Sequence, residues 1–233
     1  MFGFTVATRA WHQLPDIPTG RWEAAGGTLN SLLYVAGGNQ ATLQDLLVYD
    51  PRTSMWDSSA TEMPEKLWAP TLTGHGSFLY VVGGKWTDPT SSGNLWRYEP
   101  STDAWTTLAP APTTRMYHAT VAIDDGLFVV GGADPSELFL DSVEHYTVAT
   151  STWSALPPMS HTRFAPAAGF IAGKIMVASG GDATWQSSLS SVELYTFSTS
   201  SWNDDTYIPT SRAASSSEVV DSFLYVMGES HQR

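Results

Sequence analysis

The apolar stretch Phe78-Leu79-Tyr80-Val81-Val82-Gly83-Gly84 decides the fold, because closely related stretches recur throughout the 233-residue chain. The related stretches read LLYVAGG at 32–38, LFVVGG at 127–132, IMVASGG at 175–181 and FLYVMGE at 223–229. Aligned on their first glycine (Gly37, Gly83, Gly131, Gly180 and Gly228), they are spaced by 46, 48, 49 and 48 residues. A continuous apolar run that ends in glycine is typical of a strand covered on both faces. The chain is therefore built from a repeat of about 48 residues.

Two further series of residues follow the same period. Tryptophans recur, each preceded at a distance of seven residues by an aromatic, at Phe4/Trp11, Tyr49/Trp56, Tyr98/Trp105, Tyr146/Trp153 and Tyr195/Trp202. An arginine lies sixteen or seventeen residues before the glycine in four repeats, at Arg21, Arg115, Arg163 and Arg212, whereas the second repeat has Leu67. Turn residues such as Asp50-Pro51 separate the aromatic from the tryptophan. Each period is predicted to form four short strands and no helix, which makes the chain all-β.

The paired glycines, the tyrosine and the tryptophan about six residues beyond it resemble the kelch repeat, and the resemblance covers essentially the whole chain. It implies a β-propeller, in which four-stranded blades circle a central channel. A single four-stranded sheet cannot bury both of its faces, whereas a closed ring of such sheets can. The recurring tryptophans and tyrosines are then expected to pack as wedges between the blades.

The two ends of the chain carry parts of the repeat. Residues 4–11 match residues 146–153 at five of eight positions, so the chain begins in the third strand of a repeat and ends just past the second strand of another. We therefore expect residues 1–233 to form one domain, with full blades at about 15–60, 61–109, 110–157 and 158–205. A composite fifth blade would combine 206–233 with 1–14, which leaves no open sheet edge. The alternative is a fragment of a six- or seven-bladed ring, because six or seven blades are usual in kelch relatives.

Composition narrows the classes of partner. The chain has 42% hydrophobic and 15% charged residues and a net charge of −12, which disfavours phosphate backbones and anionic membrane surfaces as partners. It contains no cysteine, so disulfides and thiolate metal sites are excluded. No run is apolar for long enough to span a bilayer, and the first residues do not read as a secretory leader. We expect a cytoplasmic monomer that binds neither nucleic acid nor membrane and needs no cofactor.

Antiparallel pairing predicts where a ligand binds. The second strand of each blade ends beside the start of the first, so segments around the arginine series and loops after the glycines share one end of the propeller. In kelch relatives that bind peptides, this end carries the binding pocket. The expected binding residues are Arg21, Trp22, Glu23, Asn39, Trp68, Lys85, Trp86, Arg115, Tyr117, His118, Asp134, Arg163, Asp182, Trp185 and Arg212.

Tryptophan and arginine dominate the energetics of protein interfaces, and four of the five tryptophans outside the wedge series map to this end. The leading hypothesis is a module that binds a protein or peptide. A ring of arginines would suit a ligand with acidic and apolar character. The alternative interpretation of the arginine series is structural, with each guanidinium bonding loop carbonyls.

Enzymatic alternatives have weaker support, and no catalytic residue is assigned. The copper chemistry of the galactose oxidase branch needs a cysteine, which this chain lacks. Glu137, Asp141 and His145 match the spacing of the iron-binding signature of plant specifier proteins, but four residues of strand separate ligands by roughly 13 Å, too far for one metal. A sialic-acid mutarotase-like activity would need acid/base groups at the channel mouth, for which Glu23, His118, Asp134 and Asp182 are available.

Overall fold

The computed structural model describes residues 1–5, 7–38, 44–84, 93–182 and 187–229. This part of the chain forms twenty strands and no helix, arranged as four four-stranded and two two-stranded antiparallel sheets. Blade 1 comprises β3 (Ala25–Leu29), β4 (Leu32–Ala36), β5 (Leu46–Asp50) and β6 (Met55–Asp57). Blade 2 comprises β7 (Thr71–His75), β8 (Phe78–Val82), β9 (Leu95–Glu99) and β10 (Ala104–Thr107).

The third and fourth sheets repeat the same order. Blade 3 comprises β11 (Ala119–Ile123), β12 (Gly126–Val130), β13 (Val143–Thr147) and β14 (Thr152–Leu156). Blade 4 comprises β15 (Ala167–Ile171), β16 (Lys174–Ala178), β17 (Ser191–Thr196) and β18 (Ser201–Tyr207). The two-stranded sheets are β1 (Phe2–Thr5) with β2 (Ala10–Gln13), and β19 (Ala213–Val220) with β20 (Phe223–Glu229).

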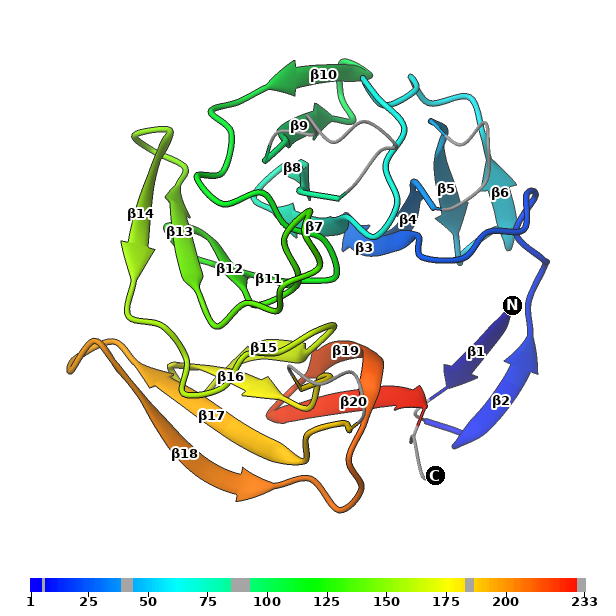
Figure 1. Cartoon of the computed structure of the whole chain (residues 1–233). Coiled ribbons are helices and arrows are strands. Elements are labelled where there is room, and N and C mark those ends of the chain that lie inside the picture. Colours follow the sequence, from blue (N-terminus) through cyan, green and yellow to red (C-terminus); the bar gives the residue numbers. More distant parts are fainter. Residues whose placement is uncertain (6, 39–43, 85–92, 183–186, 230–233) are drawn as a thin grey trace.

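The blades are arranged around a central channel, as the repeat predicts (Figure 1). The innermost strands pack in sequence order, β3 on β7, β7 on β11, β11 on β15 and β15 on β19. Residues of all five strands line one cavity of about 480 Å³. The apolar second strands β8 and β12 are buried along almost their whole length, which explains their uninterrupted hydrophobic sequence. The all-β propeller prediction is confirmed.

The recurring tryptophan joins each full blade to the connection that enters it. The indole N–H of Trp105 donates to the Thr61 carbonyl at 2.9 Å, and that of Trp153 donates to the Ala109 carbonyl at 2.8 Å. Trp56 and Trp202 make the equivalent bonds. Each indole also lies 4.9–5.2 Å from the ring of the tyrosine opposite it in the neighbouring strand. Buried apolar surface and one directed hydrogen bond therefore recur at each blade.

The glycine pair forms the second connection between blades. The N–H of Gly84 donates to the carbonyl of Arg115 in the next repeat at 2.9 Å, and Gly38, Gly132 and Gly180 make the same bond. Gly83 precedes it at φ +59°, and a Cβ there would lie 2.4 Å from the same carbonyl. In blade 4, Ser179 and Gly180 take this conformation, with φ of +62° and +103°. Ser179, not Gly180, therefore corresponds to the first glycine of the other repeats, and the sequence alignment is shifted by one residue in this repeat.

The chain ends form two half-blades. Within the described residues, β1–β2 and β19–β20 are separate two-stranded sheets, and no strand pairing joins them. Phe4 lies opposite Trp11, as each tyrosine lies opposite its tryptophan in the full blades. The hairpins thus correspond to the outer and inner halves of a blade, while the composite fifth blade stays a prediction, as does the larger-ring alternative.

The full blades specify the register of a composite blade. They pair the residue two positions before the first glycine with the residue two positions before the tyrosine, as in Val81 with Trp96 and Val129 with Glu144. The same pairing in a composite blade would place Val226 opposite Phe2. Because the chain has no cysteine, a Phe2→Cys/Val226→Cys variant offers a single possible disulfide. We expect mild oxidation to give an intramolecular bond, seen as a faster-migrating monomer on a non-reducing gel. Disulfide-linked dimers alone would instead place the two edges in different molecules.

Candidate binding face at one end of the propeller

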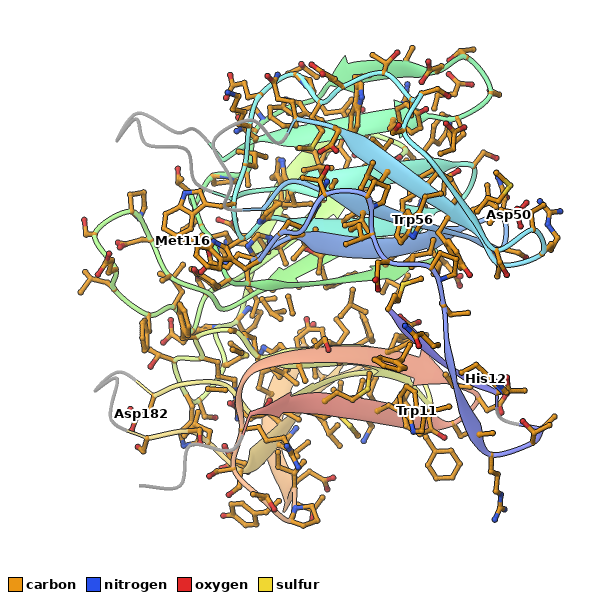
Figure 2. All side chains as sticks on the ribbon, turned by 90° about the vertical axis from the view of Figure 1, so that its right-hand side faces the viewer. Trp11, His12, Asp50, Trp56, Met116 and Asp182 are labelled. Atoms are coloured by element: carbon orange, nitrogen blue, oxygen red, sulfur yellow. The ribbon has the colours of Figure 1, made fainter. Side chains whose placement is uncertain are left out.

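The described parts of the predicted binding segments lie at one end of the propeller. Met116, beside the repeat arginine, and Asp182, directly after the glycine pair of blade 4, lie at one end in Figure 2. Trp56, Asp50 and Trp11 lie at the opposite end (Figure 2). Antiparallel pairing thus separates a face formed by the arginine and post-glycine segments from a face formed by the hairpin turns. We call the first of these the mouth face.

Five residues with left-handed backbone form a rim around the channel at the mouth face, and backbone hydrogen bonds join four of them. The rim consists of the residue two positions after each repeat arginine or its leucine substitute: Glu23, Ala69, Tyr117, Ala165 and Ala214. All five have a positive φ, between 47° and 56°. The backbone N–H of Ala69 donates to the backbone carbonyl of Glu23 at 2.9 Å. In the same way, the N–H of Tyr117 donates to the carbonyl of Ala69 at 3.1 Å, and the N–H of Ala165 donates to the carbonyl of Tyr117 at 2.8 Å. Left-handed backbone is unfavourable for residues other than glycine, so its recurrence here indicates that the fold imposes it.

The side chains of this rim converge on an aromatic cluster. The Tyr117 hydroxyl donates to the carboxylate of Glu23, which belongs to the connection into blade 1, two blades away. Tyr117 lies 4.6 Å from the Phe164 ring and, edge-on, 6.2 Å from Trp68. Burial first, and then the Glu23 carboxylate, raise the pKa of Tyr117, so the phenol stays protonated and able to donate. We call Glu23, Trp68, Tyr117 and Phe164 the mouth cluster.

Phe164 was not among the expected site residues, and neither was Phe139, which stacks on it at 5.0 Å. The signal for Phe164 was present in the sequence, because it directly follows Arg163 as Trp22 follows Arg21 and Trp68 follows Leu67. Phe139 has no counterpart at a fixed position of the repeat. Its contact depends on the course of the loop between β12 and β13.

The arginine series is built into the blades. Arg163 is fully buried, and its guanidinium donates to the Ser179 carbonyl at 2.6 Å and to the Glu193 carboxylate at 2.9 Å. Arg115 is equally buried; it donates to the Gly131 carbonyl at 2.9 Å and lies 3.0 Å from the carboxylate of Glu144. These two side chains have no surface to offer a ligand, which corrects their assignment as binding residues. Charge pairing and donation to carbonyls account for the burial of two cations.

The same position is occupied differently in the other repeats. Arg21 has a 2% exposed side chain held by both carboxylate oxygens of Asp45, at 3.0 and 2.9 Å. Arg212 donates to the Gly228 carbonyl at 2.5 Å. In blade 2, the buried Leu67 replaces the arginine, and Trp96 stands where blades 3 and 4 carry the glutamate. Cation and anion are thus replaced together by an apolar pair.

His118 is also buried rather than presented to a ligand. It lines the channel below the rim, and its Nε2 lies 3.0 Å from the hydroxyl of Thr71. Burial first, and then the nearby Arg115 charge, lower the pKa of His118 to about 3. Its burial corrects its assignment as a binding residue, and the neutral imidazole at physiological pH removes it from the acid/base groups available at the mouth.

This burial predicts a pH dependence of stability. The unfolded chain binds a proton at His118 below about pH 6.5, whereas the folded chain does so only near pH 3. Stability should therefore fall as pH is lowered, by at most about 1.4 kcal/mol per pH unit from this residue. The free energy of unfolding in urea would be measured for wild type and His118→Gln between pH 7 and 5. We expect it to fall less steeply with decreasing pH in the variant than in wild type. Equal slopes would mean that the native imidazole takes up its proton as freely as the unfolded one.

The remaining expected residues have different environments. Trp22 is 63% exposed. Asp134 accepts the backbone N–H groups of Ser136 and Leu138 and so shapes its own loop, and Asp182 accepts the hydroxyl of Ser187. Asn39, Lys85, Trp86 and Trp185 lie outside the described residues.

Two groups of possible metal ligands can be placed. His161, Glu193 and Asp204 have ligand atoms within 4.8 Å of one another, but the Glu193 carboxylate already pairs with Arg163, which would repel a cation. Glu137 and His145, which share a spacing with the iron-binding signature, lie apart. Glu137 is in the mouth-face loop after blade 3's glycines, whereas His145 contacts Asp125 in the β11–β12 turn at the opposite end.

Comparison with known proteins agrees with this architecture. Residues 62–228 match the model of the KLHDC2/KLHL20/DRC7 Kelch-repeats domain. Kelch-like protein 40 of Mus musculus is 28% identical over 123 residues, which are 51% of this chain and 20% of the relative. Kelch-like ECH-associated protein 1A of Danio rerio is 36% identical over 103 residues, 42% of this chain and 17% of the relative. The chain thus spans about a fifth of the length of these relatives.

A solved structure titled "Structure of YjhT" has the same fold, with a TM-score of 0.84 at 20% identity over 96% of this chain and 82% of its own. Within the described ranges, no helix is both long and apolar enough to cross a membrane. The repeat, the four-stranded blades and the family match lead to one conclusion. The chain belongs to the kelch-repeat family of β-propellers.

Proposed function

We propose that this propeller is a protein- or peptide-binding module that engages its partner with the mouth face. The observation that carries the proposal is the mouth cluster, in which Trp68, Tyr117 and Phe164 lie together beside the channel. Aromatic side chains provide large rigid contact areas and dominate binding energies at interfaces. Trp22, the residue before Glu23, is 63% exposed and adds a further aromatic side chain to this face. A relative named for its association with ECH supports the same class of function.

The protonation states of two mouth-face side chains favour binding over catalysis. General acid/base catalysis needs groups whose pKa lies near the working pH. At this face, the pKa of Tyr117 is raised and that of His118 is lowered, so neither exchanges a proton readily near neutrality. Hydrogen-bond donors, a carboxylate and aromatic rings held on a rigid rim suit recognition of a partner side chain.

Two tryptophans of equal exposure at opposite ends provide the test. Trp22, between Arg21 and Glu23 of the mouth face, is 63% exposed, and Trp11, at the opposite end in Figure 2, is 65% exposed. A random peptide library displayed on phage would be selected on the wild-type chain, and the affinity of a selected peptide would be measured by fluorescence titration. We expect Trp22→Ala to weaken binding at least about tenfold, because truncating a hot-spot residue costs more than about 1.4 kcal/mol.

Trp11→Ala is the matched control and should leave the affinity unchanged. Circular dichroism would verify that both variants remain folded. Loss of binding in Trp11→Ala with retention in Trp22→Ala would place the binding surface at the turn end and contradict the proposal.

A further inference from the structure

We propose that the mouth cluster recognises a lysine or arginine side chain of the partner. This inference rests on the proposed function and specifies the chemistry of its ligand. It replaces the expectation of an acidic ligand, whose basis was a ring of available arginines. The structure uses those guanidiniums inside the blades.

Among the described residues of the mouth face, the exposed charges are negative, whereas the cations Lys66 and Arg212 are partly exposed. Arg21, Arg115 and Arg163 have side chains no more than 2% exposed, and each is paired with a carboxylate of its own blade. Glu23 and Glu137 are exposed at this face, and Asp134 and Asp182 are partly exposed. The chain as a whole carries a net charge of −12, which adds to the attraction for a cation.

Most of the rim residues have small side chains. Three of the five rim residues are alanines, and the two large ones, Glu23 and Tyr117, bond to each other across the intervening repeat. This bond fixes the phenol beside the Trp68 and Phe164 rings. A carboxylate and an adjacent set of aromatic rings are thus held together at the channel mouth without a competing cation among the described rim residues.

A carboxylate beside aromatic rings is the combination that binds an ammonium or guanidinium group. The tyrosine hydroxyl occupies one of the acceptor positions of Glu23, and a carboxylate offers about four. Cations also gain from lying within about 6 Å of an aromatic ring centre. An acidic side chain would meet repulsion from Glu23, and the partly exposed Arg212 already donates to the Gly228 carbonyl. Trp22 and Leu138, both more than 60% exposed, would contact apolar residues that flank the cation.

Selection from the random peptide library tests the inference. Peptides selected on the wild-type chain should be enriched in lysine or arginine next to apolar residues, and replacing that basic residue by methionine should weaken binding at least about tenfold. Glu23→Gln removes the charge while leaving an oxygen that accepts the Tyr117 hydroxyl. We expect it to weaken the selected peptide about tenfold or more, and raising the salt concentration should weaken the wild-type complex.

Asp124→Asn is the matched control, because it removes one exposed carboxylate from the β11–β12 turn at the other face. It should leave affinity within about twofold of wild type. Two results would overturn the cation site and leave the proposed function standing. The first is the selection of acidic peptides. The second is equal affinity of wild type and Glu23→Gln for the selected peptide, while Trp22→Ala still binds it more weakly. Absence of any selected peptide, or binding unaffected by Trp22→Ala, would overturn both.

Discussion

Replacing Arg163 by leucine should lower the free energy of unfolding by about 3–5 kcal/mol. The change leaves the Glu193 carboxylate, which has no exposed surface, without its cation, and leaves the Ser179 carbonyl without its donor. A buried charge that loses its partner costs far more than the pair contributes, because desolvation of the remaining ion is no longer offset. Urea denaturation followed by tryptophan fluorescence measures the difference.

The double variant Arg163→Leu/Glu193→Leu separates charge burial from loss of packing. Blade 2 carries an apolar pair, Leu67 and Trp96, at the same two positions and forms the same four-stranded sheet. We therefore expect the double variant to recover more than half of the lost stability. A double variant as unstable as Arg163→Leu alone would show that the ion pair is not what makes the arginine necessary.

Gly83→Ala should destabilise the propeller by about 3 kcal/mol, compared with about 1–2 kcal/mol for Gly76→Ala. Both glycines have a φ of +59°, so both variants carry the same backbone strain. A Cβ at Gly76 meets nothing within 4 Å, whereas one at Gly83 would lie 2.4 Å from the Arg115 carbonyl. The difference between the variants therefore measures the close approach of blade 3 to blade 2.

The clash should also disturb the hydrogen bond from Gly84 to the Arg115 carbonyl. Amide exchange at Gly84 should accordingly be faster in Gly83→Ala than in Gly76→Ala. Equal stability of the two variants would mean that the neighbouring blade shifts freely, and the glycine pair would then reflect turn conformation alone.

The sequence predicted the blades because each has the same requirements. The apolar run, the tyrosine and the tryptophan recur since every blade buries the same faces, and Tyr146 and Trp153 pack at 5.1 Å as their counterparts do. The register of the fourth repeat was ambiguous because Ser179, Gly180 and Gly181 are consecutive small residues. The backbone angles and the hydrogen bond from Gly180 to Arg212 show that Ser179 takes the first position.

The sequence spacing alone does not decide the role of the arginines, because it does not tell whether a side chain points outward or inward. A signal was nevertheless available. Glu144 and Glu193 each precede the blade tyrosine by two residues, and Trp96 takes that position where Leu67 replaces the arginine. Reading the two positions together would have predicted a buried pair in blades 3 and 4, whereas the repeats of Arg21 and Arg212 have Leu47 and Phe2 at that position.

The contact between Tyr117 and Glu23 could not be predicted. These residues are 94 positions apart, in repeats that are not adjacent, and they meet only because the ring brings the rim together. Repeats predict what every blade shares, whereas a binding site is made of what differs between blades.

Hydrogen exchange measured by mass spectrometry, with and without a selected peptide, tests the use of the mouth face most directly. We predict protection of the segments 21–24, 67–70 and 115–118 around the rim, and unchanged exchange in the hairpin turns 50–54, 99–103 and 148–152. Protection confined to those turns, with no change at the rim, would contradict the account.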